Sequence, residues 1–245
     1  MKVSWEARLA VGLIAASILI YAVKLQVLDN LEVTVNYIFN SLGFLPINVL
    51  IVTLIINQLL AMRAKREKLE KLNMVIGTFF SEVGTHLLAF FSDHDPDLGL
   101  IRSHLVVQGD WSDEDFKRAE SKLRQHEYRV DMKAEDLAYL NTLLAQHRDF
   151  LLRLLENPVL LEHESFTELL RAVFHLTEEL GRREDLSSLP ASDIAHLSGD
   201  VQRSYRLLVH QWLDYMNHLR KSYPYLFSLA MRTNPFDATA TPVVR

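Results

Sequence analysis

The sequence predicts an all-α protein, with an N-terminal two-helix transmembrane hairpin followed by a cytoplasmic bundle of about five or six helices. Gly and Pro are scarce, at 8 and 7 of 245 residues, and 49% of the residues are apolar. This composition argues against a sandwich or barrel, which needs many turns. Two apolar runs come first, and later apolar residues recur every three or four positions. We expect a hairpin (1–62), a stalk helix (63–91), a helical domain (92–232) and a tail (233–245).

Residues 9–28 and 42–62 are the two predicted spans, because about twenty apolar residues cross a bilayer core as a helix. A cleaved signal peptide is the alternative for the first run. Glu6 in its charged start and the lack of a small-x-small cleavage site argue against that alternative. The spans therefore predict a membrane protein with the lipid bilayer as its surroundings.

The charges that flank the spans predict their orientation. Lys2 and Arg8 precede the first span, whereas the connection 29–41 contains Asp29 and Glu32 but no Lys or Arg. Cytoplasmic loops carry an excess of Lys and Arg. We therefore expect a multi-pass protein of the cell membrane with both termini in the cytoplasm.

Small and polar residues within the spans suggest how the helices associate. Gly12 and Ala16 form a small-xxx-small pair, which allows two helices to approach closely. In the second span Asn48, Asn57 and Gln58 are polar but not ionisable, which favours hydrogen bonds between helices. A pore lining is the alternative, and it requires an oligomer because two spans cannot enclose a channel.

A basic block follows the second span directly. It consists of Arg63, Lys65, Arg66, Lys68 and Lys71. Its simplest role is to hold this helix end on the cytoplasmic side. The alternative is that it also contacts anionic lipid headgroups, which attract such cations by about 1 kcal/mol each.

The stalk helix carries an apolar seam and a face of small residues. The seam residues alternate by three and four positions and are Leu69, Leu72, Ile76, Phe79 and Val83. Gly77 and Gly84 lie on the neighbouring face, which can take another helix at close range. Two heptads do not require a coiled coil, so the seam packs either into the domain core or against a partner.

Capping residues divide the rest of the chain into helices. We expect helices over about 96–106, 112–126, 133–156, 165–180 and 192–222. Ser112 is the expected cap of the second of these, with Trp111 stapled onto Phe116. Ser165 with Glu168 resembles a capping box for the fourth.

The sequence contains no recognisable catalytic, cofactor or metal motif. Cysteine is absent, which excludes thiol chemistry, and no Glu-x-x-His or HExxH occurs. His210, Asp214 and His218 share one helix face, which we expect to point to solvent, whereas His147 occupies a core-facing position. Residues 72–245 hold 18 Lys and Arg against 26 Asp and Glu, a net charge of −8 that argues against nucleic acid as a partner. We expect no cofactor.

Three segments resemble a family of uncharacterised prokaryotic two-span membrane proteins with a C-terminal helical cytoplasmic domain. They are LNMVIGTFFSEVGT (72–85), RDFLLRLLENPVLLEHESFTELLRAVFHLTEEL (148–180) and YPYLFSLAMRTNPFD (223–237). The resemblance implies the same hairpin-plus-domain layout and no particular activity.

The function that best fits these observations is a membrane-anchored helical scaffold or regulatory protein without catalytic activity. Its expected partner is a second copy of the chain or another membrane protein. The alternatives are an oligomeric small channel or transport component and, with less support, a metal-dependent enzyme.

Overall fold

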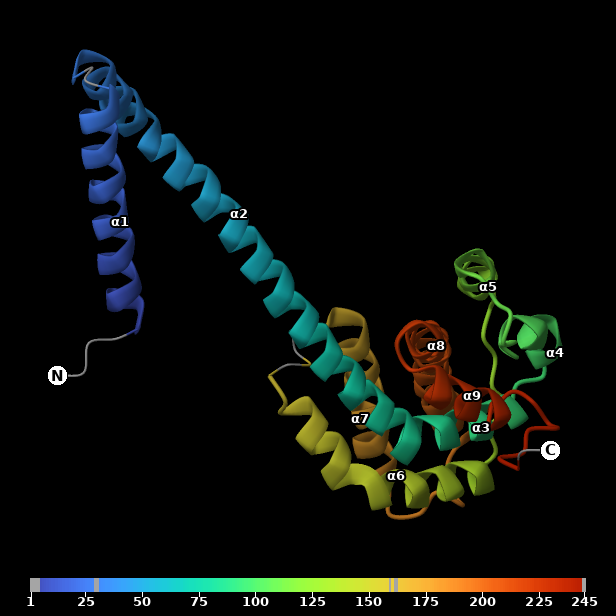
Figure 1. Cartoon of the computed structure of the whole chain (residues 1–245). Helices are drawn as coiled ribbons and strands as arrows, with labels where there is room; N and C mark the ends of the chain where they lie inside the picture. The colour runs from blue at the N-terminus through green and yellow to red at the C-terminus, as the bar shows by residue number, and fades with distance from the viewer. Residues whose placement is uncertain (1–4, 29–30, 159, 161–162, 244–245) are drawn as a thin grey trace. The chain divides into compact units, whose positions relative to one another are not determined.

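The computed structural model describes residues 5–28, 31–158, 160 and 163–243. The chain divides into two compact units, Met1–Lys65 and Arg66–Arg245. Regular structure in the described residues is helical throughout (Figure 1). The all-α prediction is therefore confirmed, and the unit boundary lies close to the expected end of the hairpin at residue 62.

The first unit consists of α1 (Trp5–Leu28) and the beginning of α2 (Leu31–Phe79). The expected connection 29–41 is wrong for its greater part, because residues 31–41 are already helical. This stretch contains no Gly or Pro, so nothing in it stops a helix. Pro46 lies inside α2 without ending it, and residues 29 and 30 lie outside the described residues.

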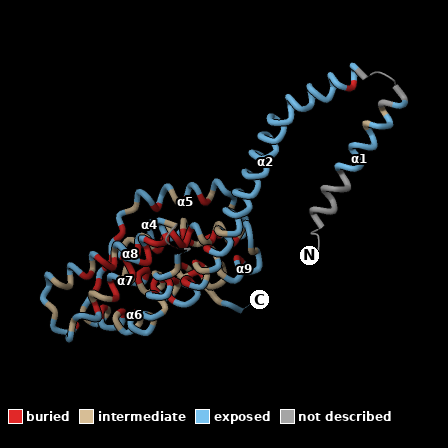
Figure 2. The backbone as a smooth tube through the Cα atoms, turned by 90° about the vertical axis from the view of Figure 1, so that its left-hand side faces the viewer, coloured by how far each residue is buried: buried red, intermediate tan, exposed pale blue. Residues whose placement is uncertain are grey.

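The described apolar side chains of the first unit lie on its surface, and Figure 2 shows the pale blue of exposed residues over part of α1 and over the first part of α2. Ile18 is 66% exposed and Leu54 is 59% exposed. Among the described residues, one helix, Glu32–Asp93, is long and apolar enough to cross a membrane, with a mean hydropathy of 2.1 in its most apolar window. Ile14–Lys24 is a shorter apolar helix. A two-helix transmembrane hairpin is thus not shown by the structure.

The expected stalk is part of the second unit from Arg66 onward. There α2 passes into a π-helical turn, η1 (Phe80–Gly84), and then into α3 (Thr85–Asp93). Most of the predicted seam is buried in the core of this unit, namely Leu72, Ile76, Phe79 and Val83. Leu69, at the start of the seam, is 45% exposed.

The remaining helices follow the predicted order closely. They are α4 (Leu98–Ile101), the 3-10 turn η2 (Arg102–His104), α5 (Asp113–Gln125), α6 (Ala134–Leu155), α7 (Glu164–Gly181), α8 (Ala191–Ser222) and α9 (Pro224–Arg232). The Ser112 cap is confirmed, because its hydroxyl accepts a hydrogen bond from the Asp115 backbone at 3.3 Å. The Ser165 cap is wrong, since the ring of His163 takes that role and accepts from the Phe166 backbone.

The core of the second unit forms around α7, which packs against both α6 and α8 (Figure 1). The red segments of Figure 2 mark this core, which also includes residues from α2, η1 and α3. The expectation of a free tail at 233–245 is wrong for its first residues, because Asn234 and Phe236 are buried. Their burial extends the folded domain beyond residue 232.

Candidate functional site

On the predicted small-residue face of α2, Gly77 faces the end of the Tyr215 side chain, which comes from α8 of the same chain. A Cβ atom added to Gly77 would lie 3.2 Å from the hydroxyl of Tyr215. The seam and Gly77 are thus used for packing within one chain. In the first unit Ala16 is exposed, whereas the surroundings of Gly12 lie outside what the structure describes.

The π-helical turn brings two consecutive aromatic rings into the core. Phe79 packs edge-on against Phe166 of α7, with ring centroids 5.3 Å apart. Phe80 stacks on Tyr215 of α8 at 5.1 Å and meets the ring of Trp212 edge-on at 5.5 Å. A π-helical turn is rare and occurs often at functional sites, so its surroundings are of interest.

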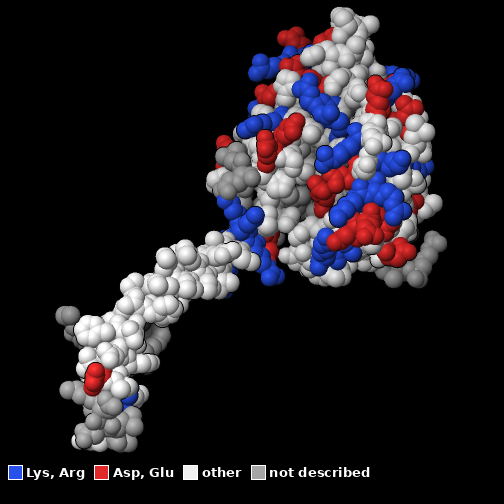
Figure 3. All heavy atoms as spheres, turned by 90° about the horizontal axis from the view of Figure 1, so that it is seen from above, with Lys and Arg blue, Asp and Glu red and all other residues white. Residues whose placement is uncertain are grey.

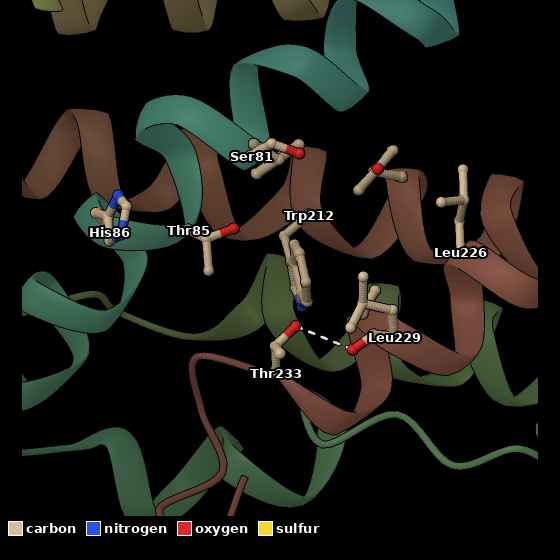
Figure 4. Close-up of a pocket in the computed structure, with 10 residues that line it drawn as sticks. Ser81, Thr85, His86, Trp212, Leu226, Leu229 and Thr233 are labelled. Carbon is tan, nitrogen blue, oxygen red and sulfur yellow. Dashed lines mark hydrogen bonds between the residues drawn. The ribbon is translucent and has the colours of Figure 1, made fainter. Parts of the chain in front are cut away.

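A hollow of about 270 Å³ lies beside this turn (Figure 4). One wall is aromatic and is formed by Phe80, Trp212 and Tyr215, whereas α9 supplies aliphatic side chains. The polar groups come from both ends of the unit's sequence, and they are Ser81, Thr85, His86 and Thr233. None of the lining residues is Asp, Glu, Lys or Arg. Such a mixture of apolar walls and a few polar groups is typical of small-molecule sites.

Trp212 contributes a buried hydrogen-bond donor to this wall that has no protein partner. The residue is 2% exposed, and its Nε1 atom makes no hydrogen bond. Figure 4 shows the nitrogen-bearing edge of the indole directed toward the part of the hollow that Thr233 lines. The Thr233 hydroxyl itself donates to the carbonyl of Leu229 at 2.9 Å. Burying a donor without a partner is unfavourable, so the indole N–H is suited to an added acceptor.

The predicted solvent-facing set His210, Asp214 and His218 is placed differently by the structure. His210 and Asp214 line a second hollow of about 390 Å³, together with Glu120 and Arg124 of α5. Burial lowers the pKa of His210, with Arg124 adding to the effect. The expectation of a solvated face holds for Asp214, which is exposed, whereas His210 and His218 are half-buried on the side of α8 against which α5 packs.

Asp214 has a strongly shifted pKa in this second hollow. Desolvation by the surrounding protein and the neighbouring Glu120 charge together raise the pKa of its carboxyl to about 6, against the opposing effect of Arg124. His218 also has a lowered pKa because of burial. His147 is half-buried, and its Nδ1 lies 2.9 Å from the carbonyl oxygen of Leu143, with which it forms a hydrogen bond. The expectation that His147 lies in the core is therefore met only in part.

Charged side chains of α7 and of the segment after it form ion pairs with neighbouring helices. Arg148 of α6 bonds to Glu178 at 2.8 Å, and Arg183 bonds to Asp193 of α8 at 2.7 Å. Asp200 of α8 is 4% exposed and lies 3.5 Å from His175. Among the described residues, no group of three or more His, Asp or Glu side chains is arranged to hold a metal ion.

The basic block after the apolar run is accessible and lies across the boundary of the two units. Arg63 and Lys65 belong to the first unit, and Arg66, Lys68 and Lys71 belong to the second. Arg66 pairs with Glu70 at 3.2 Å on the exposed helix surface. Figure 3 shows the contrast between the units, because coloured charged spheres are few over the first and dense over the second. The block therefore marks the change from an uncharged to a charged surface.

The fold and these sites define a helical protein with an apolar N-terminal unit and a separate helical domain. Residues 68–232 match the family model "Uncharacterized protein MJ1433, C-terminal helical domain", and residues 1–60 match "MJ1433, N-terminal helical domain". The chain belongs to this family. The uncharacterized protein MJ1433 of Methanocaldococcus jannaschii is 48% identical over 229 residues, which cover 94% of this chain and 92% of the relative. No solved structure matches the chain.

The family matches confirm the resemblance to a family of uncharacterised helical proteins, but they do not show its two-span membrane character. Two of the three segments lie within residues 68–232, and the third extends to residue 237. The sequence pattern did not indicate the role of Trp212 or Thr233. These residues are far apart along the chain from Ser81 and Thr85, and they lie at the same hollow only because α8 and α9 pack together beside η1.

Proposed function

We propose that this chain is a two-span membrane protein that anchors a helical interaction domain at the cytoplasmic face and has no catalytic activity of its own. The observation that carries the proposal is the exposed apolar surface of the first unit. Its large apolar side chains from Ile14 to Met62 have few protein neighbours. In water such a surface would be strongly unfavourable, whereas hydrocarbon tails can cover it.

The lengths of the helices support this proposal. α1 has 24 residues, and about 1.5 Å per residue gives it a length of roughly 36 Å, enough for a hydrocarbon core of about 30 Å. α2 is longer and continues through the apolar run into the second unit. Lys24 lies 4.9 Å from the ring centroid of Tyr37, a pairing that suits a membrane interface.

The charge distribution supports the orientation. The basic block follows the apolar part of α2, and no Lys or Arg occurs in residues 25–62. The positive-inside tendency then favours a cytoplasmic second unit. The same cations can attract anionic headgroups, which would hold the domain close to the membrane surface. The acidic domain itself is better suited to a protein partner, including a second copy of this chain, than to nucleic acid.

Single-cysteine labelling tests the topology, and the cysteine-free chain makes each introduced thiol unique. Glu32→Cys places a thiol at an exposed position between the two proposed spans, and Glu184→Cys places one in an exposed loop of the second unit. In intact cells we expect a membrane-impermeant maleimide to label Glu32→Cys only. Glu184→Cys should react after the membrane is opened. Labelling of Glu184→Cys in intact cells would contradict the orientation, and release of the protein by alkaline carbonate would contradict the spans.

The mass of the purified protein in lipid nanodiscs tests the interaction role. We expect a homo-oligomer or a complex with another membrane protein that co-purifies after cross-linking in cells. A protein that is monomeric in nanodiscs and captures no membrane protein would count against an interaction role. Ion flux through liposomes that contain only this chain would instead favour the channel alternative.

A further inference from the structure

The hollow beside the π-helical turn has features that define what it can bind. We propose that it is a binding site for an uncharged, planar ring compound that carries a carbonyl oxygen, such as a quinone. This proposal goes beyond an anchoring role, because it concerns a small molecule and a site within the second unit alone. It includes binding only and involves no redox step.

The charge of the lining determines the first property of the ligand. The side chains around the hollow carry no carboxylate, ammonium or guanidinium group. A charged ligand would lose its hydration there without gaining a counter-ion, which is strongly unfavourable. Ser81, Thr85 and Thr233 instead offer hydroxyl groups, and His86 offers a ring nitrogen, as hydrogen-bonding partners. The ligand is therefore uncharged and has few polar atoms.

The shape of the walls determines the second property. The rings of Phe80 and Tyr215 are close to parallel, at an interplanar angle of 15°, and Trp212 lies beside them at 5.5 Å from Phe80. Leu229 and Ala230 of α9 border the hollow as well. Aromatic and aliphatic walls favour a flat apolar ring through stacking and burial. A volume of about 270 Å³ suits one or two fused rings.

The unpartnered indole N–H determines the third property. Nε1 of Trp212 is a donor only, so it requires an acceptor such as a carbonyl oxygen. This nitrogen has almost no exposed surface. We therefore expect a side chain at that end of the hollow, such as Thr233, to turn aside when the oxygen binds. Thr233 can do so by giving up its bond to the Leu229 carbonyl.

The experiment uses the full chain, labelled with ¹⁵N and held in lipid nanodiscs, with two probes that differ only in polarity. Menadione carries two carbonyl groups, and 2-methylnaphthalene has the same fused rings without oxygen. The Trp212 indole resonance is assigned from its loss in Trp212→Phe. We expect menadione to shift this resonance more than 2-methylnaphthalene does, because only menadione can accept the indole proton, while the indole resonance of Trp111 stays in place.

Two variants separate the hydrogen bond from simple partitioning. Trp212→Phe keeps an aromatic wall but removes the donor, and should weaken menadione binding about tenfold while leaving 2-methylnaphthalene unchanged. Ala230→Phe fills the hollow and should abolish binding of both probes. Equal menadione affinity in the wild type and in Trp212→Phe would overturn the proposal. A Trp212 resonance that menadione does not move would also overturn it, even if a variant failed to fold.

Discussion

Asn234 holds the end of the chain on the second unit through two hydrogen bonds of its buried amide. Its Nδ2 donates to the carbonyl of Leu105 at 2.9 Å, and its Oδ1 accepts from the backbone N–H of Phe236 at 2.9 Å. Phe236 is 1% exposed and fills the core beside them. One side chain thus satisfies a buried carbonyl and a buried N–H that are 131 residues apart in sequence.

Asn234→Ala should lower the free energy of unfolding by about 2 kcal/mol, because it leaves both backbone groups buried without partners. Chemical unfolding followed by circular dichroism measures the change. Thr239→Ala is the matched control, since Thr239 is exposed and bonds only to Asp237 nearby. It should change stability by less than about 0.5 kcal/mol. Equal effects of the two substitutions would show that the Asn234 bonds contribute nothing.

Asp214 is expected to make stability depend on pH in an unusual direction. Its folded-state pKa is raised from 3.8 to about 6, mainly by desolvation. Between these values the folded state binds more protons than the unfolded state, so stability falls as pH rises through this window. Asp214→Asn should remove this fall and leave the protein more stable at pH 7 than the wild type.

An NMR titration of the side-chain carboxyl carbons measures the pKa directly. Asp113 is an internal control of opposite sign, because hydrogen bonding and attraction from Lys221 and Arg220 lower its pKa. We expect Asp214 to titrate near pH 6 and Asp113 below its ordinary value of 3.8. An Asp214 midpoint near 4 would contradict the desolvation and the repulsion by Glu120 that raise this pKa.

At the level of elements, the π-helical turn depends on Gly84. A Cβ atom there would lie 2.7 Å from Phe80 Cδ1 and 2.8 Å from Phe79 Cε1, closer than real Cβ contacts allow. Both rings are buried, so neither can move aside without disturbing the core. The small residue at position 84 is thus required by the rings of Phe79 and Phe80, whereas a Cβ atom at Gly77 would make one tight contact, with the Tyr215 hydroxyl.

Gly84→Ala should lower the free energy of unfolding by about 1–2 kcal/mol, because overpacking exceeds the gain in helix propensity. Gly199→Ala is the matched control, since Gly199 lies inside α8 with nothing within 4 Å of an added Cβ. It should stabilise the protein by about 0.5–1 kcal/mol. Thermal unfolding measures the stability of both variants. If Gly84→Ala stabilised the protein, the rings of Phe79 and Phe80 could not be crowding a Cβ atom at this position.

The start of α5 provides a second test at this level. Ser112 and Asp115 form a reciprocal capping box, with the Ser112 backbone N–H donating to Asp115 Oδ2 at 2.8 Å. Ser112→Ala should cost about 1 kcal/mol of stability. Ser121→Ala, at an exposed position within the same helix, should instead add a few tenths of a kcal/mol. Thermal unfolding distinguishes the two effects, because loss of the cap lowers the stability whereas the higher helix propensity of alanine raises it.

For the whole molecule, the two units have very different interiors. Apart from Thr34, the buried residues among those described belong to the second unit. The fragment Arg66–Arg245 therefore contains its complete hydrophobic core, and it should fold alone with a melting temperature within about 5 °C of that of the full chain. Circular dichroism measures the melting temperature, and loss of cooperative melting in the fragment would show that the first unit is needed for folding.

A carbonate wash of membranes tests the anchoring role of the first unit. The fragment should stay in the supernatant, whereas the full chain should pellet with the membranes.

The sequence predicted local features well because their causes are local. The Ser112 cap, the stop of α7 near Gly181 and the length of α8 depend on residues within a turn or two of one another. The His163 cap was missed because a histidine ring seldom serves this role and Ser165 offered a more familiar pattern. Residues 31–41 were assigned to a loop on charge and polarity alone, although no residue among them breaks a helix.

By itself the sequence determined the all-α class, the apolar first unit, the basic block after it and most helix boundaries. These features follow from composition, periodicity and charge order along the chain. Only the tertiary structure decided that most of the seam packs within one chain, that His210 and Asp214 line a hollow beside α5, and that Asn234 docks the C-terminal segment. It also brought Trp212 and Thr233 to the hollow beside η1. Such groupings depend on which helix faces pack together. The burial of apolar surface is non-directional, so one pattern of apolar residues in the sequence is compatible with several ways of packing the helices.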